Sequence, residues 1–116
     1  MAGFYGASGV LAHKLIEGNV VPYEETGVTV AGTKQAIAPD PERAHLVFYN
    51  LSDSEMVIGF SSAVGASFGM LIPPNGGFME MNLLDDLDAV TQSVWVYCAS
   101  ATKAYYIYHT RRDISI

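Results

Sequence analysis

The stretch of sequence that decides the fold is residues 45–60, HLVFYNLSDSEMVIGF. Two apolar runs, 46–51 and 56–60, are rich in β-branched and aromatic residues, and the polar segment 52–55 (SDSE) separates them. Apolar runs on both sides of turn-forming residues are typical of a β-hairpin. The sequence therefore predicts that residues 45–60 form the central antiparallel pair of a sheet.

Both faces of the first of these strands carry apolar bulk. Side chains alternate between the two faces of a strand, and they divide here into Leu46, Phe48 and Asn50 against Val47, Tyr49 and Leu51. A strand of this kind needs cover on both sides, because neither face is suited to water. A second sheet can cover one face, and a partner molecule or the terminal arm of the chain can cover the other.

Short strand patterns recur along the rest of the chain. They lie at 26–38, which bends near 31–32, and at 70–72, 78–81, 93–99 and 104–110, the last two being expected to form a closing strand pair joined by residues 100–103. Residues 39–43 (PDPER) contain two prolines and three charges, and residues 73–77 (PPNGG) contain two prolines and two glycines, so both segments predict surface turns. About eight short strands separated by turns predict an all-β fold, a jelly-roll-like antiparallel β-sandwich.

The first 27 residues have a composition of their own, with glycines spaced among small and apolar residues. Their pattern supports at most two helical turns within 11–17 before Gly18. The sequence predicts an extended N-terminal arm over residues 1–27 and a β-sandwich domain over 28–116. The arm is expected to dock either on a neighbouring molecule or along its own domain, because its apolar side chains disfavour exposure to water.

Composition excludes several classes of partner. Only 16% of the 116 residues are charged, against 50% hydrophobic residues, so the chain is expected to bury surface in an assembly. The net charge of −6 opposes binding to phosphate backbones, and no window is long and apolar enough for a membrane span, so neither nucleic acid nor membrane is an expected partner. The N-terminus lacks the pattern of a signal peptide, which predicts a protein that is made in the cytoplasm.

The sequence supplies little material for catalysis or metal binding. The three histidines, at positions 13, 45 and 109, have no metal-ligand spacing, and the acidic run 85–88 (DDLD) lacks the glycine and distal glutamate of a calcium loop. No G-x-S-x-G elbow or phosphate-binding loop is present. The lone cysteine, Cys98, falls in a strand pattern and is expected to be a buried small hydrophobe. We therefore expect no enzyme activity, no metal and no cofactor.

Several segments between residues 34 and 109 resemble those of small virion proteins of tailed bacteriophages. The segments are AIAPDPER (36–43), LVFYNLSD (46–53), VIGF (57–60), IPPNGGFMEM (72–81) and VWVY (94–97) followed by a tyrosine-rich last strand. The resemblance implies a jelly-roll or β-sandwich subunit of the phage particle. It implies a head decoration or cement protein, which binds neighbouring major capsid proteins on the capsid surface without covalent bonds.

The resemblance also implies contact residues and an oligomer. Expected contacts to the shell are the arm residues Phe4, Tyr5, Leu15 and Ile16, the turn residues Pro39, Arg43 and Pro74, and the aromatic residues Trp95, Tyr97, Tyr106 and Tyr108. A subunit at a capsid symmetry axis is expected to be a dimer or a trimer.

Two alternatives remain open at this point. One is a tail or head-to-tail accessory subunit of the same particle. The other is a carbohydrate-binding β-sandwich module, in which Trp95, Tyr97, Tyr106 and Tyr108 form a stacking platform.

Overall fold

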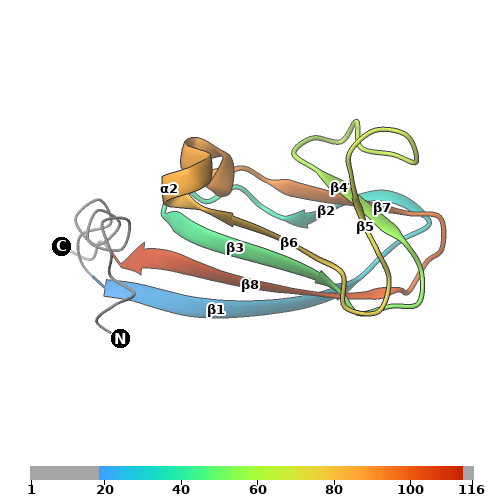
Figure 1. Ribbon diagram of the computed structural model, residues 1–116, viewed down its shortest axis with the longest axis horizontal. Coiled ribbons are helices and arrows are strands. Elements are labelled where there is room, and N and C mark those ends of the chain that lie inside the picture. Colours follow the sequence, from blue (N-terminus) through green and yellow to red (C-terminus); the bar gives the residue numbers. More distant parts are fainter. Residues whose placement is uncertain (1–18, 114–116) are drawn as a thin grey trace.

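Eight antiparallel strands form two four-stranded sheets in the computed structural model, which describes residues 19–113 (Figure 1). The strands are β1 (Asn19–Val28), β2 (Gly32–Ile37), β3 (Arg43–Asn50), β4 (Met56–Gly59), β5 (Met70–Ile72), β6 (Phe78–Asn82), β7 (Val94–Cys98) and β8 (Ala104–Asp113). Sheet A has the order β1-β8-β3-β6, and sheet B has the order β2-β7-β4-β5. The predicted all-β sandwich is confirmed.

The strand pairs are nested one inside another along the chain. The first strand pairs with the last, β2 with β7, β3 with β6 and β4 with β5. The additional pairs β3 with β8 and β4 with β7 join these nested pairs into the two sheets. The chain is therefore arranged as one long hairpin that folds over itself to form the two sheets.

The core lies between the inner faces of the two sheets, where alternate residues of each strand point inward. The most deeply buried side chains are Leu46, Phe48, Met56, Ile58, Val90, Val94, Val96, Cys98 and Ile107. The rings of Phe48 and Tyr105 stack at a centroid distance of 5.2 Å. Each fully buried aliphatic or aromatic side chain of this size stabilises the fold by about 1.5–3 kcal/mol, so this inner layer is the main source of stability.

The predicted hairpin at residues 45–60 is wrong, because β3 belongs to sheet A and β4 to sheet B. The connection between them is a corner built on the buried side chain of Asn50. Its Oδ1 accepts hydrogen bonds from the Ser52 N–H and hydroxyl, and its Nδ2 donates to the carbonyls of Ser54 and Ile72. The Asn50 side chain thus provides hydrogen-bond partners for the backbone groups of the corner. This stabilises a connection that crosses to the other sheet instead of turning back along β3.

The predicted closing pair of strands is also wrong, because β7 lies in sheet B and β8 in sheet A. Their connection runs beside the one between β1 and β2. Thr29 joins the two: its hydroxyl donates to Ser100 O at 2.7 Å, its N–H donates to Lys103 O at 3.0 Å, and its carbonyl accepts from Thr102 N–H at 2.8 Å. The β1–β2 and β7–β8 connections each cross from one sheet to the other, and they hydrogen-bond to each other. They take the place of the hairpin turn that the sequence predicted.

The boundary expected between arm and domain needs correction. Residues 19–27, assigned to the arm from their composition, form most of β1, which pairs with β8 from Asn19↔Asp113 to Val28↔Ala104. Residues 1–18 lie outside the described residues.

The acidic segment after β6 forms two short helical elements at one end of the sandwich (Figure 1). They are α2 (Leu83–Asp86) and the 3-10 helix η2 (Leu87–Thr91). Val90 from η2 is fully buried in the core.

Candidate interaction surface

The outer face of sheet A carries a row of aromatic side chains that crosses three strands. Phe78 on β6 lies opposite Tyr49 on β3, and Tyr49 lies opposite Tyr106 on β8. The ring centroids of Tyr49 and Phe78 are 5.7 Å apart, and those of Tyr49 and Tyr106 are 6.0 Å apart. We call Phe78, Tyr49 and Tyr106 the aromatic row.

Hydrogen-bonded polar side chains lie beside the aromatic row on the same face of sheet A. The Tyr106 hydroxyl donates to Glu24 Oε2 on β1 at 2.6 Å, and this hydrogen bond is the main reason that the pKa of Tyr106 rises to about 12. In the adjacent part of the face, His45 Nε2 lies 2.7 Å from Glu80 Oε2, and the ring of His45 meets that of Tyr108 edge-on at 6.1 Å. The outer face of sheet A is therefore an aromatic surface with an acidic rim.

Much of this surface is open. Phe78 is 58% exposed, and Tyr49 and Tyr106 are partly exposed.

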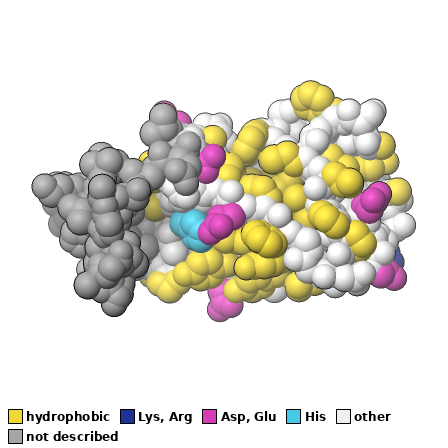
Figure 2. Space-filling view, in the orientation of Figure 1, with side chains coloured by type: hydrophobic (Ala, Val, Ile, Leu, Met, Phe, Trp, Pro, Cys, Tyr) yellow, Lys and Arg dark blue, Asp and Glu magenta, His cyan; other side chains and the backbone are white. Residues whose placement is uncertain are grey.

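Exposed hydrophobic side chains also occur outside the aromatic row. Figure 2 shows hydrophobic side chains gathered over the part of the molecule that β4, β5 and β6 occupy. The other large hydrophobic residues with high exposure are Tyr23, Val28, Val30, Leu51, Phe60, Phe68, Met70 and Leu71. Exposed apolar area of this kind marks interaction surfaces in soluble proteins.

The outer face of sheet B is partly covered by the chain itself. The loop 60–69 folds back on this face, where Val64 is buried and its carbonyl accepts a hydrogen bond from the Thr33 hydroxyl at 2.8 Å. A Cβ built on Gly69 would lie 2.7 Å from Val57 Cγ1, which shows how closely the loop approaches β4. Within residues 19–113, this loop gives part of the outer face of sheet B a cover from the chain itself.

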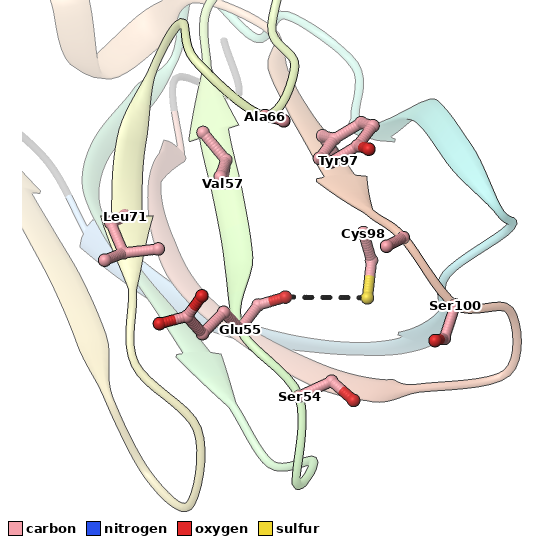
Figure 3. A pocket seen from close by; sticks show the side chains of 9 residues that line it. Ser54, Glu55, Val57, Ala66, Leu71, Tyr97, Cys98 and Ser100 are labelled. Atoms are coloured by element: carbon pink, nitrogen blue, oxygen red, sulfur yellow. Dashed lines mark hydrogen bonds between the residues drawn. The ribbon is translucent and has the colours of Figure 1, made fainter.

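A pocket of about 350 Å³ opens on this side of sheet B, where β4 and β7 separate (Figure 3). Val57, Leu71, Ala66 and Tyr97 provide its apolar walls. Its remaining lining residues are Ser54, Glu55, Cys98, Ala99 and Ser100. The thiol of Cys98 donates to Glu55 O at 3.6 Å, which links the two strands beside the pocket. We call it the sheet B pocket.

A second, polar pocket of about 370 Å³ lies where the two sheets part near the start of β3. Arg111 binds Asp40 through a hydrogen-bonded ion pair, and His109 Nε2 lies 2.9 Å from Glu25 Oε2. Burial lowers the pKa of His109, although its hydrogen bond to the Glu25 carboxylate opposes this effect. Burial opposes ionisation of Asp40, but its bonds to Arg111 and to the Glu42 N–H hold the pKa of Asp40 below its usual value.

Arg43, a predicted contact residue, is part of this polar cluster and not of the surface. Its side chain is 2% exposed and donates to the carbonyls of Ala38, Val90 and Gln92. It therefore ties β3 to the segments before and after it, and it is not available to a partner. By contrast, Pro39 is exposed and Pro74 is partly exposed.

The four aromatic residues of the predicted stacking platform do not come together. Trp95 and Tyr97 lie on the outer face of sheet B, while Tyr106 and Tyr108 lie on the outer face of sheet A. The platform was derived from a hairpin between β7 and β8 that does not exist. The arm residues Phe4, Tyr5, Leu15 and Ile16 fall outside the described residues.

Sequence reasoning missed Phe78 and Tyr49, which complete the aromatic row with Tyr106. Alternation along residues 46–51 already placed Tyr49 on a second apolar face, so this signal was present. What the sequence lacked was the pairing of β3 with both β6 and β8, which brings the three rings together.

Within residues 19–113, no group of three or more metal-binding side chains is close enough to hold an ion. The helical segments of that same range include none with the length and hydropathy needed to cross a membrane. No family model matches the sequence, and a search of curated proteins finds no significant match.

Proposed function

We propose that this chain is a structural subunit of a tailed-phage particle, a head decoration protein that binds neighbouring major capsid proteins without covalent bonds. The aromatic row on the outer face of sheet A is the observation that carries the proposal. Tyrosine and phenylalanine bury large areas at a small cost in side-chain entropy, which is why they are enriched in protein interfaces. The three rings support one another, so the surface is ordered before a partner arrives.

The proposal also rests on the resemblance between residues 34–109 and small phage virion proteins. A compact jelly-roll-like sandwich with few charges suits a subunit that is held between larger neighbours. In this proposal the protein is made in the host cytoplasm, reaches the capsid surface and acts there as a dimer or a trimer. A tail or head-to-tail position is the alternative within the same particle.

The carbohydrate-binding alternative has less support, because its four-residue platform is divided between opposite faces of the sandwich. A glycan-binding screen separates it from the decoration proposal. Saturable binding of one sugar class would favour the carbohydrate module, whereas a decoration protein should bind none.

Co-sedimentation with phage heads tests the proposed function. Purified full-length chain is mixed with heads that were assembled without it, and bound chain is separated on a density gradient. We expect binding that saturates at a fixed number of copies per head and raises the temperature at which the heads open. Heads of an unrelated phage serve as the control, and absence of saturable binding to the cognate heads would refute the proposal.

Deletion of residues 1–18 tests the proposed role of the arm, because it stops just before β1 begins at Asn19. If the arm contacts the shell, the shortened chain should bind heads more weakly while unfolding at the same denaturant concentration. Equal retention of the full and shortened chains on heat-stressed heads would remove the arm from the proposed interface.

A further inference from the structure

We infer that the sheet B pocket receives a basic side chain, arginine or lysine, from a partner protein. This inference rests on the proposed function and adds to it the chemistry that the partner must present. The site lies on the opposite side of the sandwich from the aromatic row, so a decoration subunit could hold two neighbours at once.

The shape and lining of the pocket fit a long side chain with a charged end. Val57, Leu71 and Tyr97 give apolar walls, against which the methylene stem of an arginine or lysine packs well. The volume of about 350 Å³ exceeds what one such side chain needs. A purely polar ligand would leave these walls without contacts.

The polar part of the pocket consists mainly of groups that accept hydrogen bonds. Glu55 carries a carboxylate, which lies on the Leu71 side of the pocket in Figure 3, and a backbone carbonyl that accepts from the Cys98 thiol. Ser54 and Ser100 carry hydroxyls, which can accept or donate. No Lys, Arg or His is among the nine residues that line the pocket. Ammonium and guanidinium groups carry only donors, and this lining offers them a carboxylate with no cationic side chain to repel them, which favours a cation over an anion.

Glu55 is free to pair with an incoming cation. The neighbouring Asp53 is already bound by Lys103 at 2.9 Å, and Glu24, Glu25, Glu42 and Glu80 also have side-chain partners. Within residues 19–113, the Glu55 carboxylate makes no hydrogen bond or ion pair. The net charge of −6 on the whole chain further favours a basic partner.

The opening itself follows from the strand register. The ladder between β4 and β7 runs from Gly59↔Trp95 to Val57↔Tyr97 and does not extend to Glu55 and Ala99. Beyond Val57, the thiol of Cys98 donates to Glu55 O across this opening. The opening between Glu55 and Ala99 therefore exists because the pairing of β4 with β7 ends at Val57.

Titration of the isotope-labelled full-length chain with N-acetylarginine methylamide, followed by amide NMR, tests the inference. N-acetylcitrulline methylamide is the matched probe, because it has the same shape without the charge. We expect saturable shifts at Glu55, Val57, Tyr97 and Ser100 with the arginine probe and weaker ones with citrulline. The substitution Glu55→Gln should weaken arginine binding about threefold or more, and Asp88→Asn, which removes an exposed charge elsewhere, should not.

Shifts that do not saturate, or an equal response of the Glu55→Gln and Asp88→Asn variants, would overturn the inference. The same two variants in the head-binding assay separate it from the proposed function. If the unchanged chain binds heads and Glu55→Gln binds equally well, the pocket inference fails and the decoration proposal stands. If the unchanged chain does not bind heads, the decoration proposal fails, and the titration alone decides whether the pocket takes a basic side chain.

Discussion

The side-chain amide of Asn50, at the end of β3, donates a hydrogen bond to the carbonyl of Ile72, at the end of β5, over 3.2 Å. Residues 50 and 72 belong to different sheets, so this bond links the two layers of the sandwich. The same amide also donates to Ser54 O at 2.7 Å within the corner. One fully buried side chain thus holds the connection that directs the chain from sheet A to sheet B.

Substitution Asn50→Ala should lower the free energy of unfolding by about 2–4 kcal/mol. It removes both donor and acceptor of the corner, and it takes the Asn50 amide away from the Ile72 carbonyl and from the buried Ser52 N–H. Urea denaturation measures the change, with Ser61→Ala in an exposed loop as the control. A loss below about 0.5 kcal/mol would show that the corner does not depend on Asn50.

The sequence predicted the strands well and the connections between them poorly. Cys98 was expected to be a buried small hydrophobe in a strand, and it is buried on β7, because burial of one face is a local property of a strand. The choice between a hairpin and a crossing between sheets depends instead on distant partners. Thr29, for example, donates to the carbonyl of Ser100, which lies 71 residues further along the chain.

The same limit explains what was missed in the candidate surface. Residues 49, 78 and 106 are far apart in sequence, and each taken singly is an ordinary strand aromatic. They become one surface only through the register of β3 with β6 and β8. Arg43 was misplaced for a related reason: a charged residue beside two prolines suggests a surface turn, yet its two terminal nitrogens donate in the interior to the carbonyls of Ala38, Val90 and Gln92, the last two from a distant segment.

Substitution Gly69→Ala should destabilise the protein by about 1–3 kcal/mol and loosen the loop over sheet B. Gly69 has φ +136°, and an added Cβ would lie 2.6 Å from Val64 Cγ2 and 2.8 Å from the carbonyl of Ile58. Gly65→Ala is a matched control in the same loop, because a Cβ there meets nothing within 4 Å. Chemical denaturation compares the two, and equal stability of both variants would contradict the proposed packing of the loop.

Acidification below pH 6.5 should lower stability through His109. This side chain is 5% exposed and packs against Tyr23, with Glu25, Asp40 and Arg43 as its charged neighbours. Burial holds its pKa in the folded state below the 6.5 of the unfolded chain. Between these two pKa values the unfolded state binds the proton and the folded state does not, so stability falls as the pH falls.

The size of the His109 effect cannot exceed about 1.4 kcal/mol per pH unit, which is the limit for one proton. Substitution His109→Gln keeps a donor for Glu25 and removes the titration, so it should flatten the dependence between pH 7.5 and 5.5. Asp40, whose pKa is also lowered, acts only below its ordinary value of 3.8 and does not overlap this range. Denaturation midpoints at several pH values measure both proteins, and parallel curves would assign the acid sensitivity to another group.

Substitution Phe78→Ala should weaken binding to phage heads about tenfold or more while changing the free energy of unfolding by less than about 1 kcal/mol. The side chain is 58% exposed, so folding gains little from it, but it forms one end of the aromatic row against which a partner would pack. Phe68→Ala is the matched control, because Phe68 is 63% exposed but lies in the loop over sheet B. Gradient sedimentation with heads and urea denaturation are run on both variants. A larger loss of binding for Phe68→Ala than for Phe78→Ala would move the proposed interface from sheet A to the loop, since the two changes remove the same ring from surfaces on opposite sides of the sandwich.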